Sequence, residues 1–313
     1  MNIAVVTDST AYLPDVMRQQ AGVTVVPLHV IVGDHEYTEG VDLTAQALAT
    51  ALRSSARVST SRPSPQVFLD TYERLAAAGA TAVVSIHLSA GLSGTCDSAL
   101  LAARQAPIPV TVVDSTTMGM GLGFAVLDAA AAARQGRLVT EVTEVARTRA
   151  AASRVLFYVH SLEYLRRGGR IGAASAMLGS ALAIKPLLTL TDGHIEPVEK
   201  QRTTRRALVR LLDLSIQVAE RSPAAVAVAV HHLDAEERAA WIVGQLADRL
   251  AGRLTGSLLG RPIPGATTSP RQPPDPTPPG QPLLVELGAV AGAHLGPGTI
   301  AVVVSPYPGS PLE

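Results

Sequence analysis

The chain has 313 residues, with 26 Lys and Arg against 26 Asp and Glu, and a single cysteine. A neutral chain lacks the excess of basic residues with which proteins hold nucleic acid or an anionic membrane surface, so neither is expected as a partner. The single cysteine excludes an internal disulfide and favours a reducing, cytoplasmic location. The first residues lack the pattern of a signal peptide, and no apolar run reaches the ~18–20 residues that span a bilayer, so no integral membrane segment is expected.

Short Val- and Ile-rich runs alternate with longer Ala- and Leu-rich helical patterns in the first half of the chain. This alternation predicts an α/β fold with a mostly parallel sheet. Strands are expected at residues 2–7, 23–32, 82–87 and 110–113, and helices at 64–78, 95–105, 121–134 and 139–152.

A second set of elements begins after Ala152, where we place a domain boundary. An Asp192-Gly193 pair between two short apolar runs predicts a β-hairpin. Strands are expected at 155–159, 186–190, 194–200, 225–230, 283–287 and 299–304, and helices at 203–220 and 235–253. The chain is thus divided into an α/β domain at 1–152 and a smaller α/β domain at 153–313.

Residues 262–282 form a proline-rich insertion within the second domain. Such a composition cannot pack a core and favours an extended, solvated chain. The segment is interpreted as a tolerated surface insertion in preference to a motif for a proline-binding partner.

Polar residues directly follow two of the expected strands, at Asp8-Ser9-Thr10 and at Asp114-Ser115-Thr116-Thr117. Ligands of parallel sheets bind at the carboxyl ends of strands, so both groups lie where a site is expected. Asp and Ser also cap helices and turns, and the sequence leaves the two interpretations open.

Two glycine-hydroxyl stretches, 88–95 and 294–299, are the most informative part of the sequence. Glycines allow successive backbone N–H groups to converge on an anion, and His294 can donate to an oxyanion near neutral pH. The stretch Gly91-Leu92-Ser93-Gly94-Thr95 also resembles a hydrolase nucleophile elbow, but Thr95 stands where that motif requires glycine. An anion site at a helix N-terminus, with Ser93, is therefore favoured over a triad of Ser93, His294 and Asp8 or Asp114.

Other patterns for cofactor chemistry are weak. Phe124 replaces the last glycine of a dinucleotide-binding pattern that starts at Gly119, and no phosphate-binding loop for ATP is present. His160, His231 and His232 lack the spacing of metal ligands and are interpreted as core or surface residues. Cys96 is interpreted as a small buried apolar group.

Basic residues concentrate around glycines at 165–172, and Lys185, Lys200 and Arg202 follow. Such a set can hold a phosphate or an acidic partner, but taken alone it is better explained as a solvated basic face. Pro65 and the hydroxyls before it predict the start of a helix.

Taken in order, these motifs resemble the DegV family, the fatty-acid-binding subunits of bacterial fatty acid kinase. The resemblance covers nearly the whole chain, because ten short stretches match in register. They are residues 6–10, 60–65, 92–95, 114–115, 168–172, 185–186, 193–195, 200–202, 286–288 and 294–299.

The resemblance implies a two-domain α/β protein that encloses one long-chain fatty acid and has no cofactor or metal of its own. It implies that Thr60, Ser93 and His294 hold the carboxylate, with Ser61, Arg62, Gly94 and Thr95 around it. A separate kinase subunit would supply ATP and phosphorylate the carboxylate to an acyl phosphate for phospholipid synthesis, and Arg170 and Arg202 would contact that partner or the product. The alternatives are a lipid-bound adaptor and a serine esterase that uses Ser93 and His294.

The chain departs from the family pattern next to the expected carboxylate site. Arg62 stands in place of the usual Gln, and Cys96-Asp97 stands in place of a common Tyr-Gln pair. Arg62 adds a possible charge-assisted contact to the head group.

Overall fold

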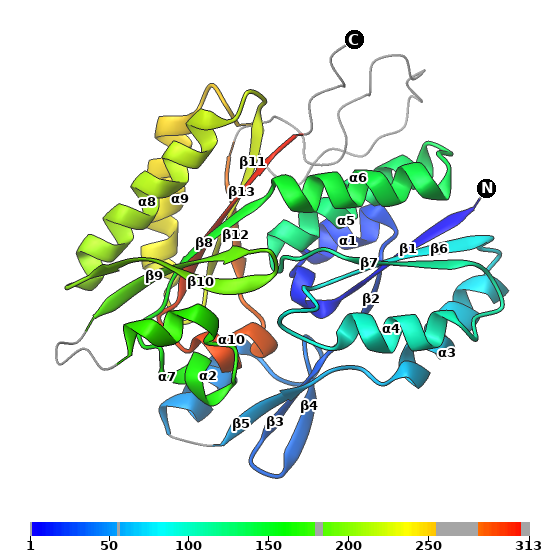
Figure 1. The fold of residues 1–313 in the computed structure, drawn as a ribbon, viewed down its shortest axis with the longest axis horizontal. Coiled ribbons are helices and arrows are strands. Elements are labelled where there is room, and N and C mark those ends of the chain that lie inside the picture. Colours follow the sequence, from blue (N-terminus) through cyan, green and yellow to red (C-terminus); the bar gives the residue numbers. More distant parts are fainter. Residues whose placement is uncertain (1, 55–56, 179–183, 255–280, 308–313) are drawn as a thin grey trace.

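The computed structural model describes residues 2–54, 57–178, 184–254 and 281–307 (Figure 1). All but the last two residues of the proline-rich insertion, 262–282, lie outside these ranges, so the interpretation of that segment stays a prediction. No helix in the described ranges is long and apolar enough to cross a membrane.

The first sheet is parallel, as the alternating pattern predicts. Its strands, in the order β2-β1-β6-β7, are β1 (Ile3–Asp8), β2 (Thr24–Val26), β6 (Ala82–His87) and β7 (Val110–Asp114). Helices α3 (Pro65–Ala77) and α4 (Thr95–Ala103) cover one face of it, and α5 (Met120–Arg134) and α6 (Val139–Ala152) cover the other. Every residue of β6 is buried, as expected for a parallel strand with helices on both faces.

A small antiparallel sheet replaces the second half of the strand expected at 23–32. Its strands, in the order β4-β3-β5, are β3 (His29–Val32), β4 (His35–Thr38) and β5 (Val58–Ser61). The prediction of one long strand was wrong because Pro27, which has no N–H for a ladder hydrogen bond, separates β2 from β3. Helix α1 (Asp15–Ala21) lies between β1 and β2, and helix α2 (Ala45–Arg53) lies between β4 and β5; neither was predicted from the sequence.

The second half of the chain forms a six-stranded sheet in the order β10-β9-β8-β13-β11-β12. Its strands are β8 (Arg154–Tyr158), β9 (Lys185–Thr191), β10 (His194–Gln201), β11 (Val226–His232), β12 (Leu283–Glu286) and β13 (Ile300–Pro306). Helices α8 (Thr204–Arg221) and α9 (Glu236–Leu250) cover its outer face. The predicted hairpin is confirmed: Asp192 and Gly193 join β9 to β10, both with positive φ.

The elements stack as alternating helical and sheet layers, with α5 and α6 between the two sheets (Figure 1). One cluster of buried apolar side chains joins both halves, since it contains Ile3, Val84 and Phe124 together with Phe157 and Val303. The predicted boundary near Ala152 falls between α6 and β8 and stays a prediction.

Short helices complete the region between the small sheet and the second half of the chain. They are the 3₁₀ turns η1 (Ser9–Ala11) and η2 (Gly172–Met177), and the helices α7 (Glu163–Arg167) and α10 (Ala289–Leu295). Helix α10 packs against α2, α7, β3 and β5. It was not predicted because six of its seven residues are buried, so its sequence has no alternating apolar and polar faces.

Candidate functional site

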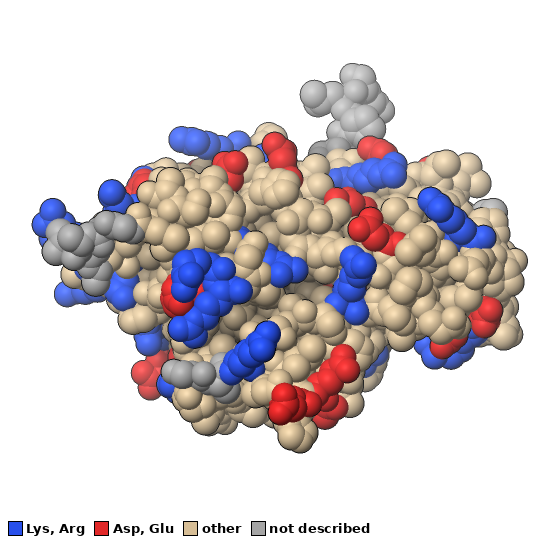
Figure 2. Space-filling model, turned by 60° about the horizontal axis from the view of Figure 1, so that its bottom comes forward, with Lys and Arg blue, Asp and Glu red and all other residues tan. Residues whose placement is uncertain are grey.

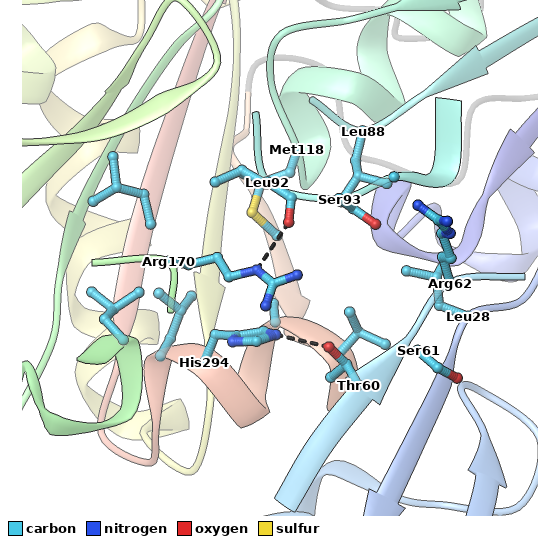
Figure 3. A pocket seen from close by; sticks show the side chains of 16 residues that line it. Leu28, Thr60, Ser61, Arg62, Leu88, Leu92, Ser93, Met118, Arg170 and His294 are labelled. Carbon is cyan, nitrogen blue, oxygen red and sulfur yellow. Dashed lines mark hydrogen bonds between the residues drawn. The ribbon is translucent and has the colours of Figure 1, made fainter. Parts of the chain in front are cut away.

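A cavity of about 340 Å³ opens where the carboxyl end of β6 meets β5, the β9–β10 hairpin and α10 (Figure 3). Its volume lies in the range of small-molecule sites. Sixteen residues from both halves of the chain line it: Leu28, Thr60, Ser61, Arg62, Leu88, Leu92, Ser93, Gly94, Met118, Leu165, Arg170, Ile195, Val290, Ala291, His294 and Leu295.

Hydroxyl groups and an imidazole gather at one end of this cavity. Thr60, at the end of β5, lies with its Oγ1 atom 2.9 Å from Nε2 of His294 in the last turn of α10. Ser93, in the loop before α4, has its Oγ atom 2.9 Å from Oγ1 of Thr95. Figure 3 shows the side chains of Thr60, Ser93, Arg170 and His294 around a common space.

Arg170 brings a guanidinium group from the second half of the chain to this end. Its Nε donates to the carbonyl oxygen of Leu92 at 3.0 Å, and its Nη1 donates to the carbonyl oxygen of Gly168 at 2.6 Å. Both acceptors are neutral carbonyls, so the positive charge is not neutralised by these contacts and is available to an anion.

His294 is neutral at physiological pH. Burial and, to a smaller extent, the positive charge of Arg170 together lower its pKa to about 4. Its Nδ1 atom is buried without a hydrogen-bond partner among the described residues. Gly168 lies so close that a Cβ there would overlap this atom, which explains the glycine.

Arg62 lies at the mouth, where its guanidinium passes over Gly94 so closely that a Cβ on Gly94 would overlap it. Within the described ranges no hydrogen bond or ion pair holds Arg62, and the lining residues include two arginines and no carboxylate. The polar end of the cavity is therefore suited to an anion.

The opposite end of the cavity is apolar. Met118, Ile195 and Leu295 line both the main cavity and a second, smaller space between the sheets. Apolar side chains form almost the whole wall of this second space, and His231 is the one polar residue in its lining. The other lining residues are Met118, Gly119, Val155, Phe157, Leu190, Ile195, Leu287, Leu295, Ala301 and Val303. The two spaces therefore adjoin, and the second, with a volume of about 30 Å³, extends the apolar lining of the first.

Most of the residues that the sequence analysis assigned to a site line this cavity: Thr60, Ser61, Arg62, Ser93, Gly94, Arg170 and His294. Thr95 does not line it, because it is fully buried behind Ser93. Arg202 is exposed at the end of β10 and is not among the lining residues.

The two polar groups after β1 and β7 act as caps of loops. Asp8 accepts hydrogen bonds from Thr10 and from the backbone N–H of Leu88. Asp114 accepts from the backbone N–H groups of Ala90 and Thr116. Both carboxylates therefore shape the loop that carries Ser93, and neither lines the main cavity.

The hydrogen bonds required for a serine esterase are not formed. Ser93 pairs with Thr95, and Nε2 of His294 pairs with Thr60, so no bond joins the nucleophile to the base. An Asp-His-Ser chain does occur, from Asp8 through His87 to Ser85. Its three side chains are fully buried, so no substrate can reach the hydroxyl.

Sequence reasoning missed the apolar wall of the cavity, which includes Leu28, Met118, Leu165, Ile195 and Val290. Ordinary core residues have the same composition, so no local signal distinguishes these side chains. Only the arrangement of the two halves brings them to one cavity.

Comparisons with known proteins point to one family. The family model described as "uncharacterised protein, DegV family" matches residues 2–260. A DegV domain-containing protein of Streptomyces coelicolor is 47% identical over 97% of this chain and 98% of its own.

Two solved structures are similar over almost their whole length. One shows fatty acid binding by a DegV family protein from Thermus thermophilus, with 34% identity, 98% of this chain and 100% of that chain covered, and a TM-score of 0.83. The other is DegV of Bacillus subtilis, a fatty acid binding protein, with 31% identity, coverage of 98% and 99%, and a TM-score of 0.82. The chain described here belongs to the DegV family.

Proposed function

We propose that this protein is a cytoplasmic carrier that binds one long-chain fatty acid in the cavity and presents its carboxylate to a partner kinase. The observation that carries the proposal is a cavity that combines hydroxyls and arginines with an apolar wall and adjoins a second, apolar space. The fatty acid binding described for the relatives from Thermus thermophilus and Bacillus subtilis supports it.

The hydroxyl groups of Thr60 and Ser93 each accept a hydrogen bond from a neighbouring side chain, so each directs its own proton to the carboxylate. Neutral His294 donates from Nε2 to Thr60, which leaves the Thr60 hydroxyl proton for one carboxylate oxygen. Thr95 donates to Ser93 in the same way, so the Ser93 proton serves the other oxygen. Several donors are needed because a buried carboxylate without partners costs several kcal/mol.

The remaining residues of the polar end supply charge and backbone donors. Arg62 and Arg170 offset the negative charge of the head group, and Ser61 and Gly94 line the same end. The acyl tail extends past Met118, Ile195 and Leu295 into the apolar space between the sheets. Burial of each methylene contributes about 0.8 kcal/mol, so the tail supplies most of the affinity.

The carrier has no ATP site of its own, and the partner kinase brings ATP. A carboxylate oxygen attacks the γ-phosphorus, the bond to the β-phosphate oxygen breaks, and acyl phosphate and ADP result. The acyl phosphate then serves phospholipid synthesis. Arg170 stabilises the added phosphate charge, and exposed Arg202 contacts the kinase.

Charge on the molecular surface supports docking of an acidic partner. Figure 2 shows Lys and Arg side chains gathered over the middle of the face that it presents. Arg166 and Arg167 of α7, which precede Arg170, are exposed and share one acidic partner, Glu163.

Mass spectrometry of the purified protein under denaturing conditions tests the binding step. We expect a fatty acid of 14 to 18 carbons to accompany the protein, a length that the family resemblance implies. Thr60→Val and Ser93→Ala should each retain about ten- to a hundredfold less oleate, since each loses a hydrogen bond to a charged group. Thr148→Val, on the exposed face of α6, is the control. An absence of fatty acid together with indifference to added oleate would refute the proposal.

The presentation step is tested by mixing the oleate-loaded protein with Mg-ATP and the fatty acid kinase ATP-binding subunit of the same organism. Hydroxylamine converts an acyl phosphate to a hydroxamate, which a colour reaction measures. We expect hydroxamate only when both proteins are present, and none with Arg170→Ala. Retained oleate without any hydroxamate would instead favour the lipid-bound adaptor.

A further inference from the structure

A cluster of buried Glu39 with half-buried Ser9 and Tyr12 lies at the start of α10, outside the cavity that holds the proposed ligand. Glu39 follows β4 and is only 4% exposed. Its Oε1 accepts the backbone N–H of Val290 at 2.7 Å and the Tyr12 hydroxyl at 3.3 Å, and its Oε2 accepts the Ser9 hydroxyl at 2.5 Å.

The cluster satisfies backbone groups that would otherwise have no partner. The first N–H groups of a helix have no acceptor within the helix, and Gly288, the residue before α10, has no side chain to cap it. Glu39 accepts a hydrogen bond from the N–H of Val290, and the Tyr12 hydroxyl accepts one from the N–H of Ala291 at 3.0 Å. Gly288 must be glycine here, because a Cβ would overlap both Glu39 and Tyr12.

The same cluster is connected to the lining of the cavity in two ways, through Leu28 and through α10. Ser9 Oγ accepts the backbone N–H of Leu28 at 3.0 Å, and Leu28 lines the cavity. Helix α10 supplies Val290, Ala291, His294 and Leu295 to the lining. A helix of seven residues is not stable by itself, so its placement depends on such external anchors.

We propose that Ser9, Tyr12 and Glu39 form a clamp that fixes α10 and thereby positions His294 for the head group of the ligand. Glu39 is a positioning residue, since it acts through the helix and does not line the main cavity. The inference rests on the proposed fatty acid binding for its functional consequence. The clamp itself can be tested without ligand.

Ionisation of Glu39 makes the stability of the clamp depend on pH. Burial raises the pKa of Glu39 to about 7, against the opposing effect of the hydrogen bonds from Ser9 and Val290. The titratable groups that face it are Tyr12 and Asp8, and the negative charge of Asp8 contributes to the raised pKa. The raised pKa means that desolvation outweighs the three hydrogen bonds, so the clamp is weakened when Glu39 ionises, because opening lets water solvate the carboxylate.

Amide hydrogen exchange of the ligand-free protein tests the clamp. After correction for the intrinsic rates, we expect the wild-type protection of residues 289–295 to fall between pH 6 and pH 8, because the closed cluster holds the pKa of Glu39 at about 7. In Glu39→Gln that protection should be lower and independent of pH, while α5 is unchanged. Tyr12→Phe should lower the protection of the same segment, and it serves as a second probe if Glu39→Gln does not fold.

Oleate titrations of the delipidated proteins test the consequence for binding. Glu39→Gln should bind oleate on the order of tenfold more weakly, the loss expected when one charge-assisted hydrogen bond is removed. Tyr12→Phe should bind it more weakly by a smaller factor. Glu286→Gln is the matched control, because Glu286 lies near the start of α10 but is exposed and forms no hydrogen bond or ion pair among the described residues.

The outcomes separate the clamp from the proposed function. Unchanged exchange of 289–295 in Glu39→Gln and Tyr12→Phe would overturn the clamp, and so would an equal loss of protection throughout the molecule. Wild-type protein that does not bind oleate would refute the proposed function, whereas the exchange result would still decide the clamp.

Discussion

At the scale of single residues, burial decides the charge of each group at the cavity. The histidine of the 294–299 stretch was expected to donate near neutral pH, and its lowered pKa makes it a neutral imidazole there, with a single N–H to donate. The positive charge comes from Arg62 and Arg170. A neutral His294 is well suited to orient Thr60, because it donates one proton without repelling the arginines.

The lowered pKa of His294 predicts how stability depends on pH. The pKa of His294 is about 4 in the folded protein and about 6.5 in the unfolded chain. At pH values between these two, the unfolded state therefore binds more protons than the folded state. The free energy of unfolding should therefore fall as the pH decreases from 6.5 to 4. Between pH 7.5 and pH 5, His294 should account for a loss of about 2 kcal/mol.

Urea denaturation of ligand-free wild type and His294→Gln at these two pH values measures this contribution. The variant should lose less stability on acidification than the wild type, because glutamine does not titrate. His231, whose pKa burial also lowers to about 4, contributes equally to both proteins and cancels. Equal losses in the two proteins would show that His294 does not titrate as stated.

At the scale of elements, the helices and strands that could be predicted are those marked by a pattern in their own sequence or in the residues next to them. The strands of the parallel sheet stand out as short apolar runs, and the β9–β10 hairpin is marked by Asp192-Gly193. Helix α3 begins where Ser64 and Pro65 indicate, since the Ser64 hydroxyl accepts the N–H of Val67. Each of these signals arises within a few residues of the element that it predicts.

Elements stabilised by distant residues could not be predicted in this way. Helix α10 is buried on all sides and anchored by Glu39, which lies about 250 residues earlier in the chain. The polar residues of the candidate site could be identified from motifs and family resemblance. The apolar wall could not, because Leu28 and Ile195 look like core residues until the fold brings them together.

At the scale of the whole molecule, the two halves of the chain cooperate to form the cavity. Arg170, from the second half, donates to the carbonyl of Leu92 in the first, and Ser89 donates to the carbonyl of Gly193. The apolar cluster between the sheets also draws on both halves. A ligand in the cavity therefore contacts, and should stabilise, both halves together.

This shared core predicts one thermal unfolding transition for the delipidated protein, even though the sequence predicts a domain boundary near Ala152. Oleate at a hundred times its dissociation constant adds about 2.7 kcal/mol to the stability of the folded state. For a chain of 313 residues, that should raise the whole transition by about 4 °C. Differential scanning calorimetry with and without oleate measures the shift. Two separate transitions, of which oleate moves only one, would show that the halves unfold independently and that one of them alone holds the ligand.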